Sequence, residues 1–304
     1  MGRELVCQLA AEGCHVAMCD VSADNMADTE SLALEGAPTG VRVISALADV
    51  SKVDQVVAFA TTVASGLETT HINLLFNNAG IGGGGSFVLD DRDEWDTTFE
   101  VCWGGVYHGT RAFMPMLLAS SAGHVVNTSS VNGFWASLGP NNPHTAYSAA
   151  KFAVKGFTEA LISDFRLNAP HLRASVVMPG HIGTSIVINS MKAFGRDPKE
   201  LDEHQVAQIR ERFGSRGIAL DDASDEDIRQ GMQMQAEMFR DGAPMTAAQA
   251  ATIILDGVRR GDWRILVGDD AHLLDEMVRE TPDDAYEVSF IERLQAMGVF
   301  QFAL

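Results

Sequence analysis

The chain has 304 residues, of which 46% are hydrophobic and 21% charged, and its formal net charge at pH 7 is −19. A chain of this length and composition can bury a full core without disulfides or a structural metal. The negative charge argues against nucleic acid as a partner, because phosphate binding needs a basic surface. We interpret the acidic excess as a solvated surface, with attraction of a cationic substrate as the alternative.

No apolar run approaches the roughly 20 residues that a membrane span needs, and no basic segment leads into an apolar one as in a secretion signal. The sequence therefore predicts a soluble, cytoplasmic protein with no membrane partner. Its four cysteines follow no metal-ligand spacing, so we expect buried, reduced thiols and no metal site. They are Cys7, Cys14, Cys19 and Cys102.

Short β-type runs alternate with longer helical segments along the first 270 residues. Strands are expected at 14–20, 40–46, 72–78, 123–129, 173–179 and 263–268, and helices at 2–12, 23–35, 51–67, 94–119, 145–168 and 246–260. This spacing indicates βαβ units, and therefore an α/β fold whose parallel sheet carries helices on both faces. We interpret residues 1–304 as a single domain.

Residues 182–245 depart from this alternation, because they hold long, irregular helical sequence where such a fold needs only a short connection. Insertions at the carboxyl ends of strands form substrate pockets in these folds, so we predict a substrate lobe or lid. The many methionines of this segment suit a bulky apolar substrate, and packing within the lobe is the alternative. Residues 270–304 are expected to form a C-terminal helical extension.

Tyr147 and Lys151 lie four residues apart in a helical segment. At this spacing the two side chains share a helix face, so the ammonium can favour the ionised phenol. A tyrosine whose pKa is lowered in this way can donate and accept a proton near neutral pH. Of the three tyrosines, neither Tyr107 nor Tyr286 has a lysine at that spacing.

Ser130 follows directly after the strand expected at 123–129. A hydroxyl at the carboxyl end of a parallel strand points into the crevice where ligands bind in such sheets. The alternative is a serine that merely ends a strand.

Other predicted strands also end in polar or small residues. Asp20 closes the first, where a carboxylate accepts hydrogen bonds from adenosine ribose hydroxyls and repels a 2′-phosphate, which favours NAD over NADP. At two further strand ends the backbone can approach a cofactor closely. The residues there are Asp49, Val50, Asn77, Asn78, Ala79 and Gly80. The glycine-rich run at 80–85 resembles a phosphate-binding loop, but no helix follows it directly, so we interpret it as flexible.

Four motifs in sequence order resemble the short-chain dehydrogenase/reductase family across nearly the whole chain. They are NNAG at 77–80, NTSS at 127–130, YSAAK at 147–151 and PGHIGT at 179–184. The resemblance implies a Rossmann-type doubly wound parallel sheet. It also implies hydride transfer between NAD(H) and a secondary alcohol or ketone.

The same resemblance implies roles for individual residues. Tyr147 would be the general acid/base, Lys151 would lower its pKa and hold the nicotinamide ribose, and Ser130 would bind the substrate oxygen. The residues implied to position the nicotinamide are Pro179, Gly180, Ile182 and Thr184. A homodimer or homotetramer through the helices at 94–119 and 145–168 is also implied.

Three features depart from the family pattern. The first strand and most of its glycine-rich loop are expected to be missing, with Gly2 as the last loop glycine, which suggests that Met1 is an internal methionine. Cys102 stands where the family has an asparagine that helps hold a water linked to the lysine, and a thiol is a poor replacement. His144 lies in an extended loop, as a surface residue or, alternatively, a substrate contact.

We therefore predict an NAD-dependent oxidoreductase whose small-molecule substrate is a secondary alcohol or a ketone. Two alternatives are a cofactor-binding pseudoenzyme or sensor, and an inactive, truncated fragment. The set of Ser130, Tyr147 and Lys151 argues against a sensor, because a sensor needs no catalytic acid.

Overall fold

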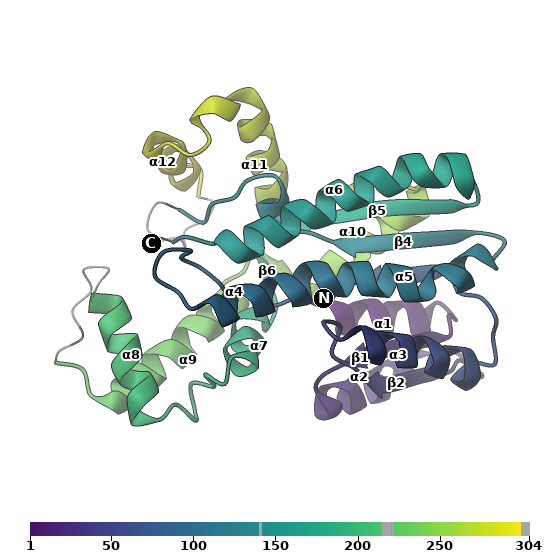
Figure 1. Cartoon of the computed structure of the whole chain (residues 1–304), viewed down its shortest axis with the longest axis horizontal. Helices are drawn as coiled ribbons and strands as arrows, with labels where there is room; N and C mark the ends of the chain where they lie inside the picture. The colour runs from purple at the N-terminus through teal and green to yellow at the C-terminus, as the bar shows by residue number, and fades with distance from the viewer. Residues whose placement is uncertain (140–141, 215–219, 221, 299–304) are drawn as a thin grey trace.

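The computed structural model describes the chain except for residues 140–141, 215–219, 221 and 299–304 (Figure 1). Its first half contains α1 (Gly2–Ala11), β1 (Val16–Asp20), α2 (Ala23–Gly36), β2 (Val43–Leu47), α3 (Val53–Gly66), β3 (Leu74–Asn77), α4 (Arg92–Phe99), α5 (Gly105–Leu118) and β4 (Gly123–Thr128). Then follow α6 (Thr145–Asn168), β5 (Leu172–Pro179), α10 (Ala247–Arg260) and β8 (Arg264–Val267). The expected alternation of strands and helices is confirmed.

The strands form parallel ladders, as the sequence predicts. A four-stranded sheet has the order β3-β4-β5-β8, and β1 pairs with β2 in a separate two-stranded sheet. Within the described residues no ladder joins β1 to β3. Residues of β1 and β3 are mostly half-buried, whereas every residue of β4 is buried. The sheet is thus divided between β1 and β3, and the absence of a first strand stays a prediction.

Local signals in the sequence explain where α10 begins and ends. Thr246 and Gln249 form a capping box, in which each side chain accepts from the other residue's backbone N–H. Gly261 ends the helix with φ of 74°, a left-handed conformation that favours glycine. The buried face of α10, with Ile254 and Leu255, packs in one cluster with Leu5 of α1. α1 and α10 together therefore cover one face of the sheet.

The helix expected at 94–119 is divided by a π-helical segment at Glu100–Gly104, between α4 and α5. A π-turn widens the helix by one residue and shifts the side chains that follow it. Cys102 lies in this segment and is fully buried. The expected helical segment is confirmed, since the three parts follow one another without a break, but its hydrophobic periodicity does not reveal the single-residue widening.

Residues 182–245 fold as β6 (Ile182–Gly183), α7 (Ile186–Ala193), α8 (Glu203–Gly214), α9 (Asp225–Asp241) and β7 (Met245–Thr246). In Figure 1 the three helices project together beyond the end of the sheet. The C-terminal segment contains α11 (Asp269–Glu280) and α12 (Val288–Ala296), whose Phe290 ring lies 5.8 Å from that of Trp135. No helix in the described part of the chain is long and apolar enough to cross a membrane.

Candidate active site

The end of β4 and the first turns of α6 bring Ser130, Tyr147 and Lys151 together. The Lys151 Nζ atom lies 5.3 Å from the centre of the Tyr147 ring, and the Ser130 side chain lies near enough to the phenol to lower its pKa. The Ser130 oxygen also accepts from the backbone N–H of Asn132 at 3.2 Å, which orients the hydroxyl. The arrangement places an ammonium, a phenol and a hydroxyl around one point.

Buried hydrogen bonds hold this arrangement in place. Lys151 is only 2% exposed, and its Nζ donates to the carbonyl oxygen of Thr128, the last residue of β4, at 2.9 Å. The Ser129 hydroxyl donates to the backbone carbonyl of Lys151 at 2.8 Å. The two adjacent serines therefore differ: Ser129 ties α6 to the sheet, while Ser130 faces the phenol.

Burial raises the pKa of Tyr147 above its ordinary value, and this is the largest effect on the group. The Lys151 ammonium and the Ser130 hydrogen bond each lower that pKa, while the nearby Cys102 raises it. The net direction is opposite to the one expected from the spacing alone, because the spacing does not reveal the burial. The phenol is consequently held in its protonated form, ready to donate.

The thiol of Cys102 lies beside this group. Its Sγ donates to the carbonyl oxygen of Ile81 at 3.1 Å. A Cβ atom on Gly80 would lie 3.4 Å from the Lys151 Nζ and 3.6 Å from the Cys102 Sγ. The backbone after β3 therefore runs directly past the lysine. Of the other cysteines, Cys7, Cys14 and Cys19 are only partly buried, and all four are free thiols.

We expect Cys102→Asn to keep or raise turnover, because an amide can also donate to the Ile81 carbonyl and is the stronger hydrogen-bonding group. Steady-state kcat measured for both proteins tests this expectation. A large loss of turnover would instead show that the thiol has a role of its own. Cys19→Asn, at a partly buried thiol on β1, serves as the control substitution.

The glycine-rich run at 80–85 is packed on several sides instead of forming a free loop. The Gly82 N–H donates to the Ser190 Oγ of α7 at 2.8 Å. A Cβ on Gly83 would lie 2.6 Å from the Phe194 ring, and one on Gly84 would lie 2.5 Å from the Cβ of Ala146. The run is thus clamped between the lobe and α6, and its glycines allow this close approach.

Several predicted cofactor residues lie at the divided edge of the sheet. Asp20 is exposed at the end of β1, and one of its oxygens accepts from the Ser22 N–H at 3.0 Å. A Cβ on Gly2 would lie 2.9 Å from the Asn78 amide nitrogen. The Asn78 Oδ1 is buried and finds no hydrogen-bond partner among the residues that the structure describes. An exposed carboxylate, a close glycine and an unpaired amide oxygen fit the polar parts of a dinucleotide.

Other predicted cofactor residues have internal partners. The Asp49 carboxylate accepts from the Ser51 N–H at 2.9 Å, and the Val50 carbonyl contacts the His108 Nδ1 at 3.1 Å. The Asn77 amide donates to the Asn127 Oδ1 at 2.8 Å, which ties β3 to β4. These groups shape the edge of the sheet, where Ala79 lies between Asn78 and Gly80.

The four residues expected to hold the nicotinamide lie on one short stretch. Pro179 ends β5, Gly180 follows it, Ile182 opens β6, and Thr184 precedes α7. The Gly180 N–H donates to the Val267 carbonyl of β8 at 2.9 Å, which continues the sheet ladder into the turn. This turn leads directly from the sheet into the lobe.

His144 occupies the N-cap position of α6 and its ring packs on that of Tyr147. Its ring centre lies 4.7 Å from that of Tyr147, and burial lowers its pKa to about 4. The residue is partly buried, and with this lowered pKa its ring is uncharged at neutral pH. A contact with substrate stays a prediction.

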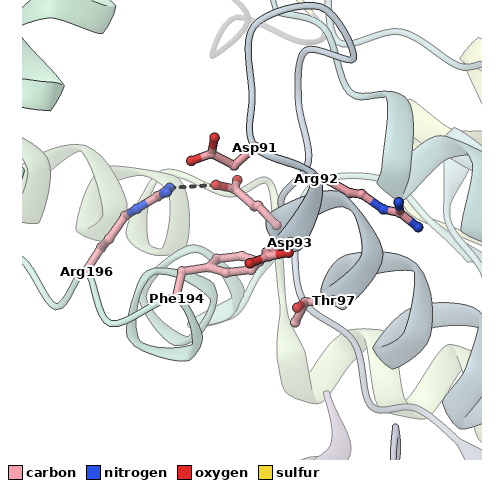
Figure 2. A pocket seen from close by; sticks show the side chains of 7 residues that line it. Asp91, Arg92, Asp93, Thr97, Phe194 and Arg196 are labelled. Carbon is pink, nitrogen blue, oxygen red and sulfur yellow. Dashed lines mark hydrogen bonds and ion pairs between the residues drawn. The ribbon is translucent and has the colours of Figure 1, made fainter.

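Besides its contact with the glycine-rich run, the lobe contacts α4, which the sequence did not predict. Arg196 pairs with Glu94, with 2.8 Å between Nη1 and Oε2, and Figure 2 shows the Arg196 side chain pointing toward the start of α4. The other Glu94 oxygen accepts from the Gly84 N–H at 3.1 Å. A polar cavity of about 390 Å³ adjoins the pair; its lining residues are Asp91, Arg92, Asp93, Glu94, Thr97, Phe194 and Arg196. Within the described residues, no three potential metal ligands lie together.

The chain resembles known oxidoreductases over most of its length. A family model described as short chain dehydrogenase matches residues 1–193. The putative oxidoreductase SadH of Mycobacterium tuberculosis is 32% identical over 302 residues, 99% of this chain and 92% of that protein. Levodione reductase of Leifsonia aquatica is 33% identical over 214 residues, 70% of this chain and 74% of that protein.

Solved structures agree with these relatives. A short chain dehydrogenase/reductase from Burkholderia phymatum in complex with NAD matches with a TM-score of 0.71 and 26% identity, over 93% of this chain and 90% of that chain. Related structures hold NAD or NADP.

Proposed function

Because this chain belongs to the short-chain dehydrogenase/reductase family and is an oxidoreductase, we propose that it transfers a hydride between NAD(H) and a secondary alcohol or ketone. The observation that carries the proposal is the group formed by Ser130, Tyr147 and Lys151. It places a proton donor beside an ammonium at the carboxyl end of β4. The nicotinamide, when bound, supplies or accepts the hydride.

The chain's own residues move the proton and orient the substrate. The Ser130 hydroxyl hydrogen-bonds the substrate oxygen, and the Tyr147 hydroxyl donates a proton to it during ketone reduction or accepts one during alcohol oxidation. The Lys151 ammonium stabilises the phenolate that this donation leaves. Its hydrogen bond to the Thr128 carbonyl keeps it in place through the cycle.

We assign NAD as the preferred cofactor, because the exposed Asp20 carboxylate would repel a 2′-phosphate. Together with Asp20, the residues Gly2 and Asn78 form the adenosine side of the cofactor site. The backbones of Asp49, Val50 and residues 77–80 line the edge of this side. The turn at 179–184 forms the nicotinamide side.

The Asp20→Ser variant is expected to shift the preference toward NADP by about tenfold or more in the ratio of kcat/KM values, because a charge repulsion is removed. Initial rates with each cofactor measure the ratio. Asp24→Ser, which changes a nearby carboxylate in the first turn of α2, should leave it unchanged. An unchanged ratio in Asp20→Ser would refute the assignment.

We further propose that residues 182–245 form the substrate lobe of the single domain at 1–304, and that 270–304 is a helical extension. The glycine run at 80–85 joins the lobe to the first turn of α6, close to Tyr147, through Ser190 and Phe194. The similarity to levodione reductase supports a carbonyl substrate, and the apolar side chains of the lobe support a bulky one.

A homodimer or homotetramer through α5 and α6 accompanies this proposal. Tyr107 on α5 is 40% exposed and Phe152 on α6 is 41% exposed. Trp103, whose ring lies 6.1 Å from that of Tyr107, extends this aromatic surface. Exposed aromatic side chains on adjacent helices are typical of interfaces between subunits.

Titration with NADH and NADPH, followed by a screen of secondary alcohols with NAD⁺, tests the proposal through the absorbance of the reduced cofactor. An oxidoreductase binds the cofactor and turns over. A sensor binds the cofactor but turns over none of the substrates, and an inactive fragment does not bind the cofactor. Either of the last two results would overturn the proposed function.

A further inference from the structure

A buried carboxylate lies behind the nicotinamide-side turn. Asp270, in the first turn of α11, is 6% exposed. Its Oδ2 accepts from the backbone N–H of His181 at 2.6 Å, and its Oδ1 accepts from the N–H of Ala271 at 2.9 Å. Burial raises the pKa of this carboxyl, while the two N–H groups lower it. A buried carboxylate is costly unless hydrogen bonds compensate it, and these two N–H groups do so.

At two glycines the backbone lies so close to this carboxylate that a side chain would collide with it. A Cβ on Gly180 would lie between 2.2 and 2.4 Å from the carboxyl atoms of Asp270. Gly268 precedes α11 with φ of 107°, and its Cβ would lie 2.3 Å from the Asp270 Oδ1. The backbones on both sides therefore approach the carboxylate as closely as a residue without a side chain allows.

His181 continues the contact into the lobe. Its Nε2 lies 2.7 Å from the carbonyl oxygen of Phe239 on α9, and because a carbonyl can only accept, the Nε2 is the protonated nitrogen. The His181 and Phe239 rings lie 4.4 Å apart. One residue thus joins the Asp270 carboxylate through its backbone and the lobe through its side chain.

We propose that Asp270 is a positioning residue for the cofactor: it fixes the backbone of Gly180 and His181 where the nicotinamide half of NAD(H) must bind. This inference rests on the proposed function. Asp270 touches neither substrate nor cofactor, and it acts through the turn. The signal in the sequence is the Gly-Asp-Asp at 268–270, at the end of the strand expected at 263–268.

Calorimetric titration of the full chain with NADH and with ADP-ribose, which lacks the nicotinamide, tests this role. In Asp270→Ala the His181 N–H loses its partner, and we expect the Kd for NADH to rise about tenfold. The Kd for ADP-ribose should stay unchanged, because this ligand keeps both riboses and lacks only the nicotinamide ring that the turn would position. Asp270→Asn keeps one acceptor oxygen and should give an intermediate Kd for NADH.

His272→Ala is the matched control, since His272 is exposed on the same turn of α11. Equal weakening of both ligands, or an unchanged Kd for NADH, would overturn the inference. If Asp270→Ala does not fold, the comparison of Asp270→Asn with the parent decides in the same way. Failure of the parent chain to bind either ligand would instead refute the proposed function, and this inference with it.

Discussion

Tyr147→Phe is expected to lower kcat by about 10²- to 10⁴-fold, the usual contribution of a positioned proton donor. The phenylalanine ring can occupy the same space beside Lys151 and His144 but carries no hydroxyl. NADH affinity should therefore change little. Steady-state turnover and calorimetric titration with NADH, performed on the same preparation, separate the two effects.

Tyr286→Phe provides the control for this substitution. The Tyr286 hydroxyl accepts from the Ala136 N–H at 3.2 Å, and the residue is 62% exposed on the C-terminal segment. Its removal should leave kcat unchanged. Retention of activity in Tyr147→Phe would exclude the phenol as the acid/base and with it the proposed mechanism.

Lys151→Met is expected to lower kcat for alcohol oxidation by about 10²-fold at neutral pH. Methionine fills a similar space without the charge. Because the ammonium lowers the pKa of Tyr147, its loss raises that pKa further. Alcohol oxidation needs the deprotonated phenol, so the rise of kcat with pH should move to higher pH in the variant. A pH profile of kcat measures the shift.

Lys155→Met is the matched substitution on the same helix. Lys155 is partly exposed, pairs with Glu159 at 2.9 Å, and lies about two helical turns beyond Tyr147. Its pH profile should match that of the parent chain. A Lys151→Met profile that does not move would show that the ammonium does not influence the proton donor.

Lys151→Met also removes the hydrogen-bond donor to the buried Thr128 carbonyl. We therefore expect the variant to lose about 1–3 kcal/mol of its free energy of unfolding, measurable by denaturant unfolding.

The strands and helices could be predicted because the pattern that specifies them is local. Each expected strand is a short β-type run, and each expected helix carries an apolar stripe such as that of α10, which ends at Gly261. The parallel arrangement follows from the alternation itself. The π-helical segment around Cys102 could not be predicted, since one inserted residue leaves the hydrophobic period almost unchanged.

The sequence predicts which residues come together in the candidate site, but it does not predict the direction in which the pKa of Tyr147 is shifted. Ser130, Tyr147 and Lys151 were chosen from strand ends and helix spacing, and the fold brings them together. The direction of the Tyr147 pKa was wrong, because it depends on how many atoms from distant segments surround the phenol. Burial is a property of the packed molecule.

The order of βαβ units and the residues at the strand ends follow from the amino-acid sequence, because backbone propensity and apolar periodicity act over a few residues. Contacts between residues far apart in the chain follow from packing alone. Asp270 meets His181 across 89 positions, and Arg196 meets Glu94 across 102. No local pattern records which loop will lie against which, since those partners are chosen by how the sheet and the lobe fill space.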